Sequence, residues 1–523
     1  MSAEGRRRSA RRLGLYQHAA QPPVVVAPMN PVSSPQPGVV YRPVERDWMA
    51  GWPVVVGRPS ARVVVAVGAV GVVAAVMLPS TEPGLGWLVT VLAAVAGVGW
   101  AAWQRFEPGG WPWWLARWER VGWAGLAVLS AGVCVVRSAG WLCTLALFGA
   151  VVSATLAVTG GRRLGELAFA VIAIPVAGVR GLRWVGRGIG RVRRTEQRTG
   201  RLVAAVLVGV GLVVVFGALF AGADAGFARL LLEVLRGIDV GSVLWAVFVF
   251  CVAGLGVTGA CYLLVSRPVT WAPGGARLRR AEWAVPVGLL AGLFAVFVGV
   301  QLVAMFGGSG YVLATPGLTY AQYARGGFWQ LLVVTVLTLL VIGGAVWLAD
   351  RERDRAWLRV LLGLLAVFSV VIVMSALSRM WSYQQAYGFT VTRLLVEASE
   401  VWLGVIYVLI MVAGVRMRAG WVPRAAVALA VAGVLVLAGL NPDGFIARHN
   451  IERWQVTGHL DTRYLAGLSP DAIGAVRALP EPEQGCVLVG IARLLGPQDW
   501  RVWNASRAAG RAELAGHGPA CGE

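Results

Sequence analysis

Long apolar segments recur along this chain of 523 residues, and they constrain its fold more than any other feature. A membrane hydrocarbon core about 30 Å thick needs roughly 20 apolar residues of helix. The chain is 57% hydrophobic and only 14% charged, with a mean hydropathy of +0.68, which excludes an ordinary globular surface. We therefore expect an all-α, polytopic helical membrane bundle of about 11 spans with a small helical C-terminal appendage. The expected spans are 61–78, 85–103, 121–136, 139–159, 202–221, 243–265, 283–306, 328–349, 358–377, 401–415 and 425–440.

Arginine supplies all 47 basic side chains, and its distribution predicts the topology. With the N-terminus in the cytoplasm, 33 of the 47 arginines fall before the first span or in alternate connections, and no outer connection holds more than two. Positive charge concentrates on the cytoplasmic side of membrane proteins. We expect a multi-pass protein of the bacterial plasma membrane with a cytoplasmic N-terminus and an extracytoplasmic C-terminus. The net charge of +21 lies in short loops, not on a folded soluble face, so nucleic acid is not an expected partner.

A further apolar stretch, 164–179, has arginines at both ends and is not expected to cross the membrane. We predict instead a cytoplasmic amphipathic basic segment, 160–201, which lies in the membrane interface. Its arginines from Arg180 to Arg201 would contact anionic lipid headgroups. The alternative is a plain basic loop that only sets orientation.

The remaining parts differ in composition from the spans. Residues 1–60 are rich in arginine and proline and predict a disordered cytoplasmic arm. Residues 61–159 hold the first four spans, and 202–440 hold seven more. The tail, 441–523, is nearly neutral and predicts an extracytoplasmic unit of three short helices, beginning near Pro470, Pro482 and Pro497.

Cysteine usage agrees with an exported tail. Four of the six cysteines fall inside spans, and Cys486 and Cys521 are the two in the tail. An exported pair in an oxidising compartment often bonds, so we predict a disulfide between them, the alternative being two free thiols.

Signatures of several chemistries are missing from the sequence. Without lysine there is no phosphate-binding Walker lysine and no Schiff base, and the four histidines lack metal-ligand spacing. No nucleophile and base pair is defensible, so we expect no catalytic residues, no metal and no cofactor. No charged residue falls in the central part of any expected span, which argues against proton-coupled transport.

Polar and aromatic residues gather at the outer ends of the expected spans. They form the candidate outer-face site: Asp224, Tyr320, Tyr323, Arg325, Arg379, Tyr383, Tyr387, Arg393, Glu397, Asn441 and Asp443. One interpretation is an interfacial aromatic belt together with helix caps. The functional interpretation is an external polar pocket, roofed by the tail, for a small or lipidic ligand or a partner.

At these positions the chain resembles a family of bacterial membrane proteins. The runs 320–331 (YAQYARGGFWQL), 387–394 (YGFTVTRL) and 441–451 (NPDGFIARHNI), with 460–472, are similar to the domain of unknown function 4173, a close relative of 4153. The similarity covers 202–514. It implies a multi-span membrane protein of actinobacterial type, and it supplies no activity and no catalytic residue.

Two functions fit these observations. The first is a non-enzymatic envelope scaffold or sensor accessory, with membrane lipids and an unidentified protein as partners. The second is a transporter or flippase of a small or lipid-linked solute. A lipid-modifying enzyme ranks third, because its acid and base would have to come from Asp224, Glu397 or Asp443.

Overall fold

The computed structural model describes residues 59–78, 82–102, 110–160, 164–195, 239–266, 278–306, 328–350, 352–416 and 419–515, with isolated positions between 209 and 229. They all belong to one compact unit, Gly51–Glu523. Every regular element within these ranges is a helix, which confirms the predicted all-α fold. The expected arm, 1–60, lies almost wholly outside the described residues.

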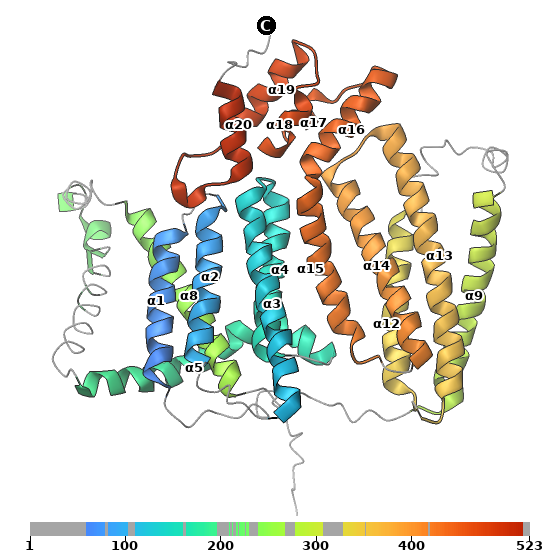
Figure 1. Cartoon of the computed structure of the whole chain (residues 1–523), viewed down its shortest axis with the longest axis horizontal. Coiled ribbons are helices and arrows are strands. Elements are labelled where there is room, and N and C mark those ends of the chain that lie inside the picture. The colour runs from blue at the N-terminus through green and yellow to red at the C-terminus, as the bar shows by residue number, and fades with distance from the viewer. Residues whose placement is uncertain are drawn as a thin grey trace, which may run out of the picture. The chain divides into compact units, whose positions relative to one another are not determined.

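Nine helices of the described ranges are long and apolar enough to cross a membrane. They lie in α2 (Leu85–Ala102), α3 (Gly110–Val136), α4 (Gly140–Thr159), α8 (Val240–Val265), α9 (Arg280–Phe306), α12 (Phe328–Leu348), α13 (Arg355–Tyr387), α14 (Val391–Arg416) and α15 (Val422–Leu440). Helix α1 (Ala61–Met77) is apolar and has 17 residues. The expected span 202–221 lies mostly outside the described residues, so the total of 11 stays a prediction. Helices α1 to α4 run in alternating directions, and so do α8, α9 and α12 to α15 (Figure 1).

Helix α5 (Leu164–Thr195) runs across the direction of the spans instead of along it (Figure 1). It packs against α8, and small residues make this close crossing possible, because a Cβ atom on Gly259 would collide with the Ile174 carbonyl oxygen. The ring of Trp184 meets Tyr262 edge-on at 5.9 Å. The helix predicted for this segment is therefore present and is not a candidate span. Its side of the membrane and its lipid contacts stay predictions.

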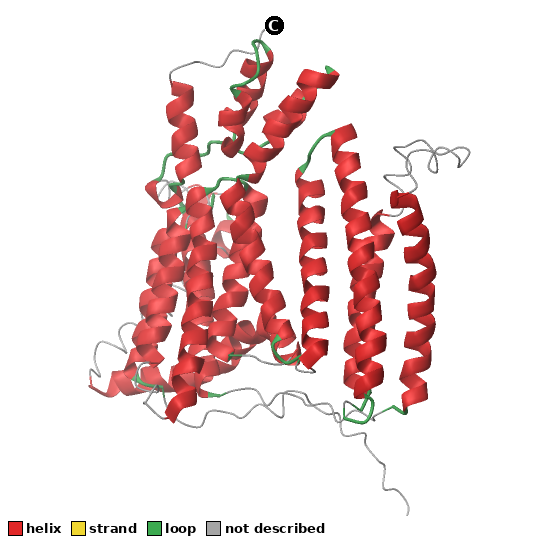
Figure 2. Ribbon diagram, turned by 45° about the vertical axis from the view of Figure 1, so that its right-hand side comes forward, coloured by secondary structure: helices red, strands yellow, loops and turns green. Residues whose placement is uncertain are grey.

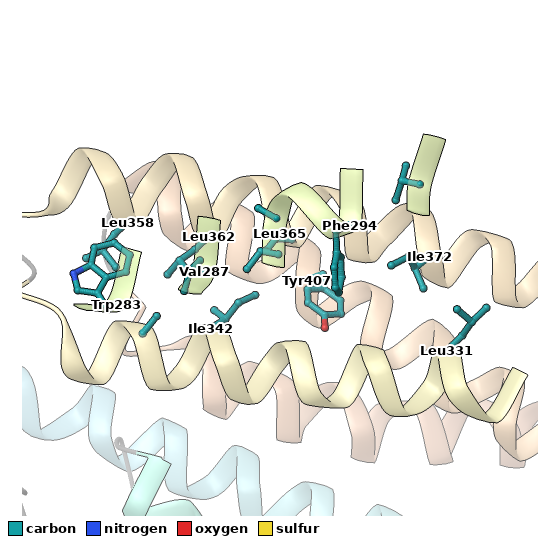
Figure 3. Packing of buried hydrophobic residues seen from close by; sticks show 14 of the residues in the cluster. Trp283, Val287, Phe294, Leu331, Ile342, Leu358, Leu362, Leu365, Ile372 and Tyr407 are labelled. Atoms are coloured by element: carbon teal, nitrogen blue, oxygen red, sulfur yellow. The ribbon is translucent and has the colours of Figure 1, made fainter. Parts of the chain in front are cut away.

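Helices α1 to α5 and α8 contact one another and form a first group. Helices α9, α12, α13 and α14 form a second group around a continuous apolar core (Figure 3). Helix α15 lies between the groups and contacts α14 on one side and α4 on the other. Large apolar side chains elsewhere on the same helices are exposed, as for Leu289 at 73% and Leu340 at 67%. An exposed apolar stripe on a helix of this length is the surface that a bilayer covers.

Helix boundaries at the end of the second group differ from the prediction. We expected spans at 358–377 and 401–415, but α13 continues to Tyr387 and α14 already begins at Val391. Polar residues interrupt the apolar pattern in both extensions, but the helices continue through them. The side chains of these residues form hydrogen bonds with neighbouring helices. Only Gly388, Phe389 and Thr390 connect the two helices.

The tail packs as a helical unit at one end of the spans, which we call the tail end; α5 lies at the opposite end (Figures 1 and 2). It contains α16 (Pro442–Thr457), α17 (Thr462–Ala466), η3 (Pro470–Ala472), α18 (Ile473–Val476), α19 (Glu483–Ala492), η4 (Trp500–Val502) and α20 (Ala505–Ala515). Helices begin near Pro470 and Pro482 as predicted. The prediction of a third helix carrying both Trp500 and Trp503 was wrong, because a single 3-10 turn precedes α20. Helix α16 was not predicted, since it follows α15 after one residue, Asn441.

Candidate functional site

The structure divides the predicted outer-face residues into separate places. Arg379, Tyr383 and Tyr387 on α13 lie beside Arg393 and Glu397 on α14, and we call these five the α13–α14 cluster. Asn441 and Asp443 instead belong to the junction of α15 with α16.

The other predicted residues are not brought to either place by the described contacts. Asp224 is exposed, and its carboxylate accepts a bond from the nearby Phe227 amide at 2.6 Å. Tyr320, Tyr323 and Arg325 lie outside the described residues.

Arg393 fastens the end of α13 to the start of α14. Its Nη1 donates to the carbonyl oxygens of Tyr387, at 3.0 Å, and Gly388. The guanidinium also lies 4.4 Å from the centre of the Tyr383 ring, which in turn contacts the Tyr387 ring at 4.9 Å. A cation at the C-terminal carbonyls of a helix opposes the helix dipole favourably. Arg393 therefore has a structural role at this connection.

Arg379 points toward α9. Its Nη2 donates to Gln301 Oε1 at 2.9 Å, and the Ser375 hydroxyl donates to the same oxygen at 2.9 Å. Arg379 and Ser375 both belong to α13. Their bonds to the buried Gln301 side chain of α9 therefore fix how α13 is rotated about its own axis near the tail end.

Gln384 connects α13 to the acidic face of α14. Its side chain is fully buried, and Nε2 donates to Glu397 Oε2 at 3.0 Å. One turn further along α14, Glu400 is also fully buried, and among the described residues neither of its carboxylate oxygens has a hydrogen-bond partner. Glu400 lies within α14, about 13 Å along the helix from Val391 at 1.5 Å per residue. The expected span 401–415 began just after Glu400, so the absence of charge from the central parts of the expected spans does not extend to α14 as folded.

Tyr407 extends this polar face further from the tail end. Its ring lies in the apolar core between Phe294 and Ile372, and its hydroxyl donates to the Thr335 carbonyl oxygen on α12 (Figure 3). Glu397, Glu400 and Tyr407 are spaced three and seven residues apart, so they share one face of α14. Ser369 of α13, which is buried here as well, has no partner for its hydroxyl among the described residues.

Asp443 and Asp471 attach the tail to the connection between α3 and α4. Asp471 Oδ2 accepts bonds from the Ser138 amide at 2.8 Å, the Ala139 amide at 3.0 Å and the Ser469 hydroxyl at 3.0 Å. Asp443 accepts from the Trp141 indole N–H at 3.2 Å. Asp471 thus caps the start of α4 from a distant part of the sequence.

Asn441 shapes the junction of α15 with α16. Its backbone is left-handed, with φ of 53°, and its side chain accepts from the Gly444 amide at 3.2 Å while donating to the Asp471 carbonyl oxygen at 3.0 Å. Asn441 and Asp443 are therefore caps and docking residues.

The last helices of the tail attach it to the connection between α1 and α2. Arg507, 3% exposed, donates to the Pro83 carbonyl oxygen at 2.6 Å and is ion-paired with Glu82. Arg501 donates to the Val76 carbonyl oxygen at 3.2 Å. The buried Asn504 side chain donates to the carbonyl oxygens of Cys134 and Arg137, both at 2.8 Å.

Helix α16 holds the connection between α13 and α14. Asn450 Oδ1 accepts from the Phe389 amide at 2.7 Å, and Nδ2 donates to the Phe389 carbonyl oxygen at 2.9 Å. The Tyr464 hydroxyl accepts from the Val391 amide at 2.9 Å, and burial raises the pKa of Tyr464. Phe389 itself is part of the apolar core of the tail. The tail therefore contacts three separate connections at the tail end.

Cys486 on α19 is disulfide-bonded. Cys521 lies outside the described residues, so its pairing with Cys486 stays a prediction. In the part of the chain that the structure describes, no group of three or more His, Cys, Asp or Glu residues could hold a metal ion.

Several residues of these clusters were not selected from the sequence. Glu400 carried a usable signal, because it follows Glu397 by three residues and precedes Tyr407 by seven inside an otherwise apolar run. Gln384 carried none, since amides of this kind usually face solvent. Asn450 and Asp471 lie within the family-like runs 441–451 and 460–472, but nothing in those runs singled them out.

A family model described as a domain of unknown function (DUF4153) matches residues 123–479. The match is to the 4153 family, the relative of the expected 4173 family, and it begins in α3 instead of at residue 202. No curated protein and no solved structure matches the chain.

Proposed function

Since this chain belongs to the DUF4153 family, which has no assigned activity, we propose its function from its own geometry: a non-enzymatic envelope protein, a scaffold or sensor accessory, that binds a partner or ligand on its extracytoplasmic tail. One observation carries the proposal. The tail has its own apolar core and yet contacts the connections α1–α2, α3–α4 and α13–α14. A partner bound to the tail would act on both helix groups at once.

The orientation is part of the proposal. The distribution of arginine places the N-terminus in the cytoplasm and the tail outside, in the plasma membrane of a bacterium. Trp500 and Trp503 are 59% and 47% exposed on a turn that packs against α2, as side chains of an interfacial aromatic belt would be. On this orientation α5 lies at the cytoplasmic surface, where its arginines would contact anionic lipids.

The free end of α16 is the surface best placed for a partner. Val456 is 87% exposed there, on a tail that is otherwise folded around a buried core. We would replace Val456 by a photo-crosslinking amino acid in living cells. The matched control is the same replacement at Val360, which is 64% exposed on the apolar helix α13.

The proposal expects a discrete protein adduct from position 456 that is absent at position 360. The variant Asn450→Ala removes the contact between α16 and the α13–α14 connection. The proposal expects this variant to lose the biological effect of the protein and still to form the adduct at position 456. Adducts that are equal at the two positions, or absent from both, would contradict a partner site on the tail.

A second candidate, a transporter or flippase of a small or lipid-linked solute, is supported by Glu400, a carboxylate buried inside a span. Its test uses vesicles containing the full-length protein and fluorescent phosphatidylglycerol in both leaflets. Chemical quenching of the inner-leaflet lipid above that of protein-free vesicles would favour transport of lipid. Equal quenching would remove a lipid flippase and leave the scaffold.

A further inference from the structure

Glu400 is a buried carboxyl group with no donor to stabilise a negative charge. The residue is 0% exposed, and in the described ranges both of its oxygens lack a hydrogen-bond partner. An ionised carboxylate in an apolar interior is so unfavourable that the group normally takes up a proton instead. Ionisable residues inside membrane spans usually belong to ion or proton pathways.

The groups around Glu400 provide no paired positive charge. On α14, Glu397 and Tyr407 share its face, and on α13 the charged group at this level is Arg379, which donates to Gln301. Helix α12 contains no titratable residue, and α15 has only Arg424, at the opposite end. On α16, Arg453 donates to the Ala386 carbonyl oxygen beyond this level. The described ion pairs do not include Glu400.

The same region has an excess of hydrogen-bond acceptors. Gln384 Nε2 is taken by Glu397, and the buried Gln384 Oε1 has no described donor. Together with Glu400, three acceptor oxygens near one turn of α14 lack a donor. A proton on Glu400 removes the buried charge and converts one of these oxygens into a donor.

A polar route joins this carboxyl to the tail end of the spans. Glu397 is half-buried one turn away, and beyond it lies Arg393, near the exposed Tyr387. Glu397 accepts a hydrogen bond from Gln384 Nε2, and the Oε1 atom of the same Gln384 side chain has no described donor. Glu397 is thus the carboxylate nearest to Glu400 on the way to the exposed end of α14.

We propose that Glu400 is a reversible proton-binding site within the membrane domain, loaded from the tail end through Glu397. The carboxylate takes a proton from a hydronium ion, releasing water, and becomes neutral; the reverse step restores the charge. The site is independent of the partner proposed for the tail.

The test is modification by dicyclohexylcarbodiimide, which adds to protonated carboxyl groups in apolar surroundings. Full-length protein in lipid nanodiscs is given a short pulse of the reagent at several values between about pH 5 and pH 9. Mass spectrometry of peptides then locates each adduct. Parallel samples contain sodium or choline chloride.

The expected result is an adduct on Glu400 that decreases at least about tenfold from the acidic to the alkaline end, the change for a group that titrates within the range. Glu400→Gln should lose it, whereas Glu282→Gln, a matched substitution in the exposed first turn of α9, should keep it. Glu400→Asp retains a carboxyl and should still react if the glutamine variant fails to fold.

Three results would overturn the proposal. The first is no adduct on Glu400 at any pH in folded protein. The second is an adduct independent of pH, which would make Glu400 a permanently neutral packing residue. The third is protection by sodium but not by choline, which would assign the site to a metal cation.

Discussion

Asp471 bonds the tail to the start of α4. Its replacement by alanine should weaken the packing of the tail against α4. Its Oδ2 accepts two backbone N–H bonds, from Ser138 at 2.8 Å and Ala139 at 3.0 Å, and two hydroxyl bonds. These amides precede the first turn of α4 and have no acceptor within the helix. Asp471→Ala therefore leaves both of them without a described acceptor.

The magnitude follows from these contacts. The hydroxyl groups can rotate to other acceptors, but each unmet buried amide costs about 1–3 kcal/mol. Arg137, whose ion pair with Asp471 is 3.8 Å long, also donates to the Ala438 carbonyl oxygen at 2.7 Å and can turn toward water. We expect a total of about 3–5 kcal/mol, the range for breaking a buried charged contact.

Hydrogen exchange with mass spectrometry measures this effect locally. At about 1.4 kcal/mol per factor of ten, exchange of the Ser138 and Ala139 amides should accelerate about 100-fold or more in Asp471→Ala. Asp471→Asn keeps one acceptor oxygen and should give a smaller change. Asp461→Ala is the matched control, because Asp461 caps α17 in the same tail at 2.9 Å from the Tyr464 amide and does not contact α4. Unchanged exchange at Ser138 and Ala139 in Asp471→Ala would refute the capping argument.

Three further predictions concern other contacts. Asn450→Ala leaves the Phe389 amide and carbonyl unpaired and should lower the stability of the α13–α14 connection by about 2–4 kcal/mol, read as faster proteolysis there, with exposed Arg448→Ala unchanged. The Arg280 hydrogen bond lowers the pKa of Asp354, so this pair stabilises the fold fully above the ordinary pKa of about 4 and loses its effect as the pH falls through the lowered value. Asp354→Asn should remove that part of the acid dependence of thermal unfolding, and an identical acid limb would contradict it. An impermeant maleimide should label the tail cysteines of intact cells only after reduction; labelling without reduction would exclude the disulfide, and none after reduction would place the tail inside.

The predicted outer-face site combined residues of two kinds that the sequence could not separate. Arg379, Arg393 and Glu397 all lie toward the tail end of α13 and α14, because polar residues at successive span ends must share one side of a bundle, but Arg379 bonds to Gln301 of α9 and Glu397 to Gln384. Asn441 and Asp443 were assigned to the same pocket, but they cap α16 and contact α3–α4. The role of Asp443 depends on Ser469 and Trp141, and that of Asn441 on Asp471, which are distant in sequence and become neighbours only after folding.

The sequence alone determined that this chain is an all-α bundle of long apolar helices, and it predicted that the helix over 164–179 would lie apart from the spans. These properties follow from the length and polarity of each segment, which are local quantities. The tertiary structure decided where α13 and α14 end, what Asp471 and Asn450 bind, and that Glu400 is buried without a described donor. Those facts depend on which helices meet, and the same carboxylate can be an exposed cap or a buried charge according to the helix packed against it.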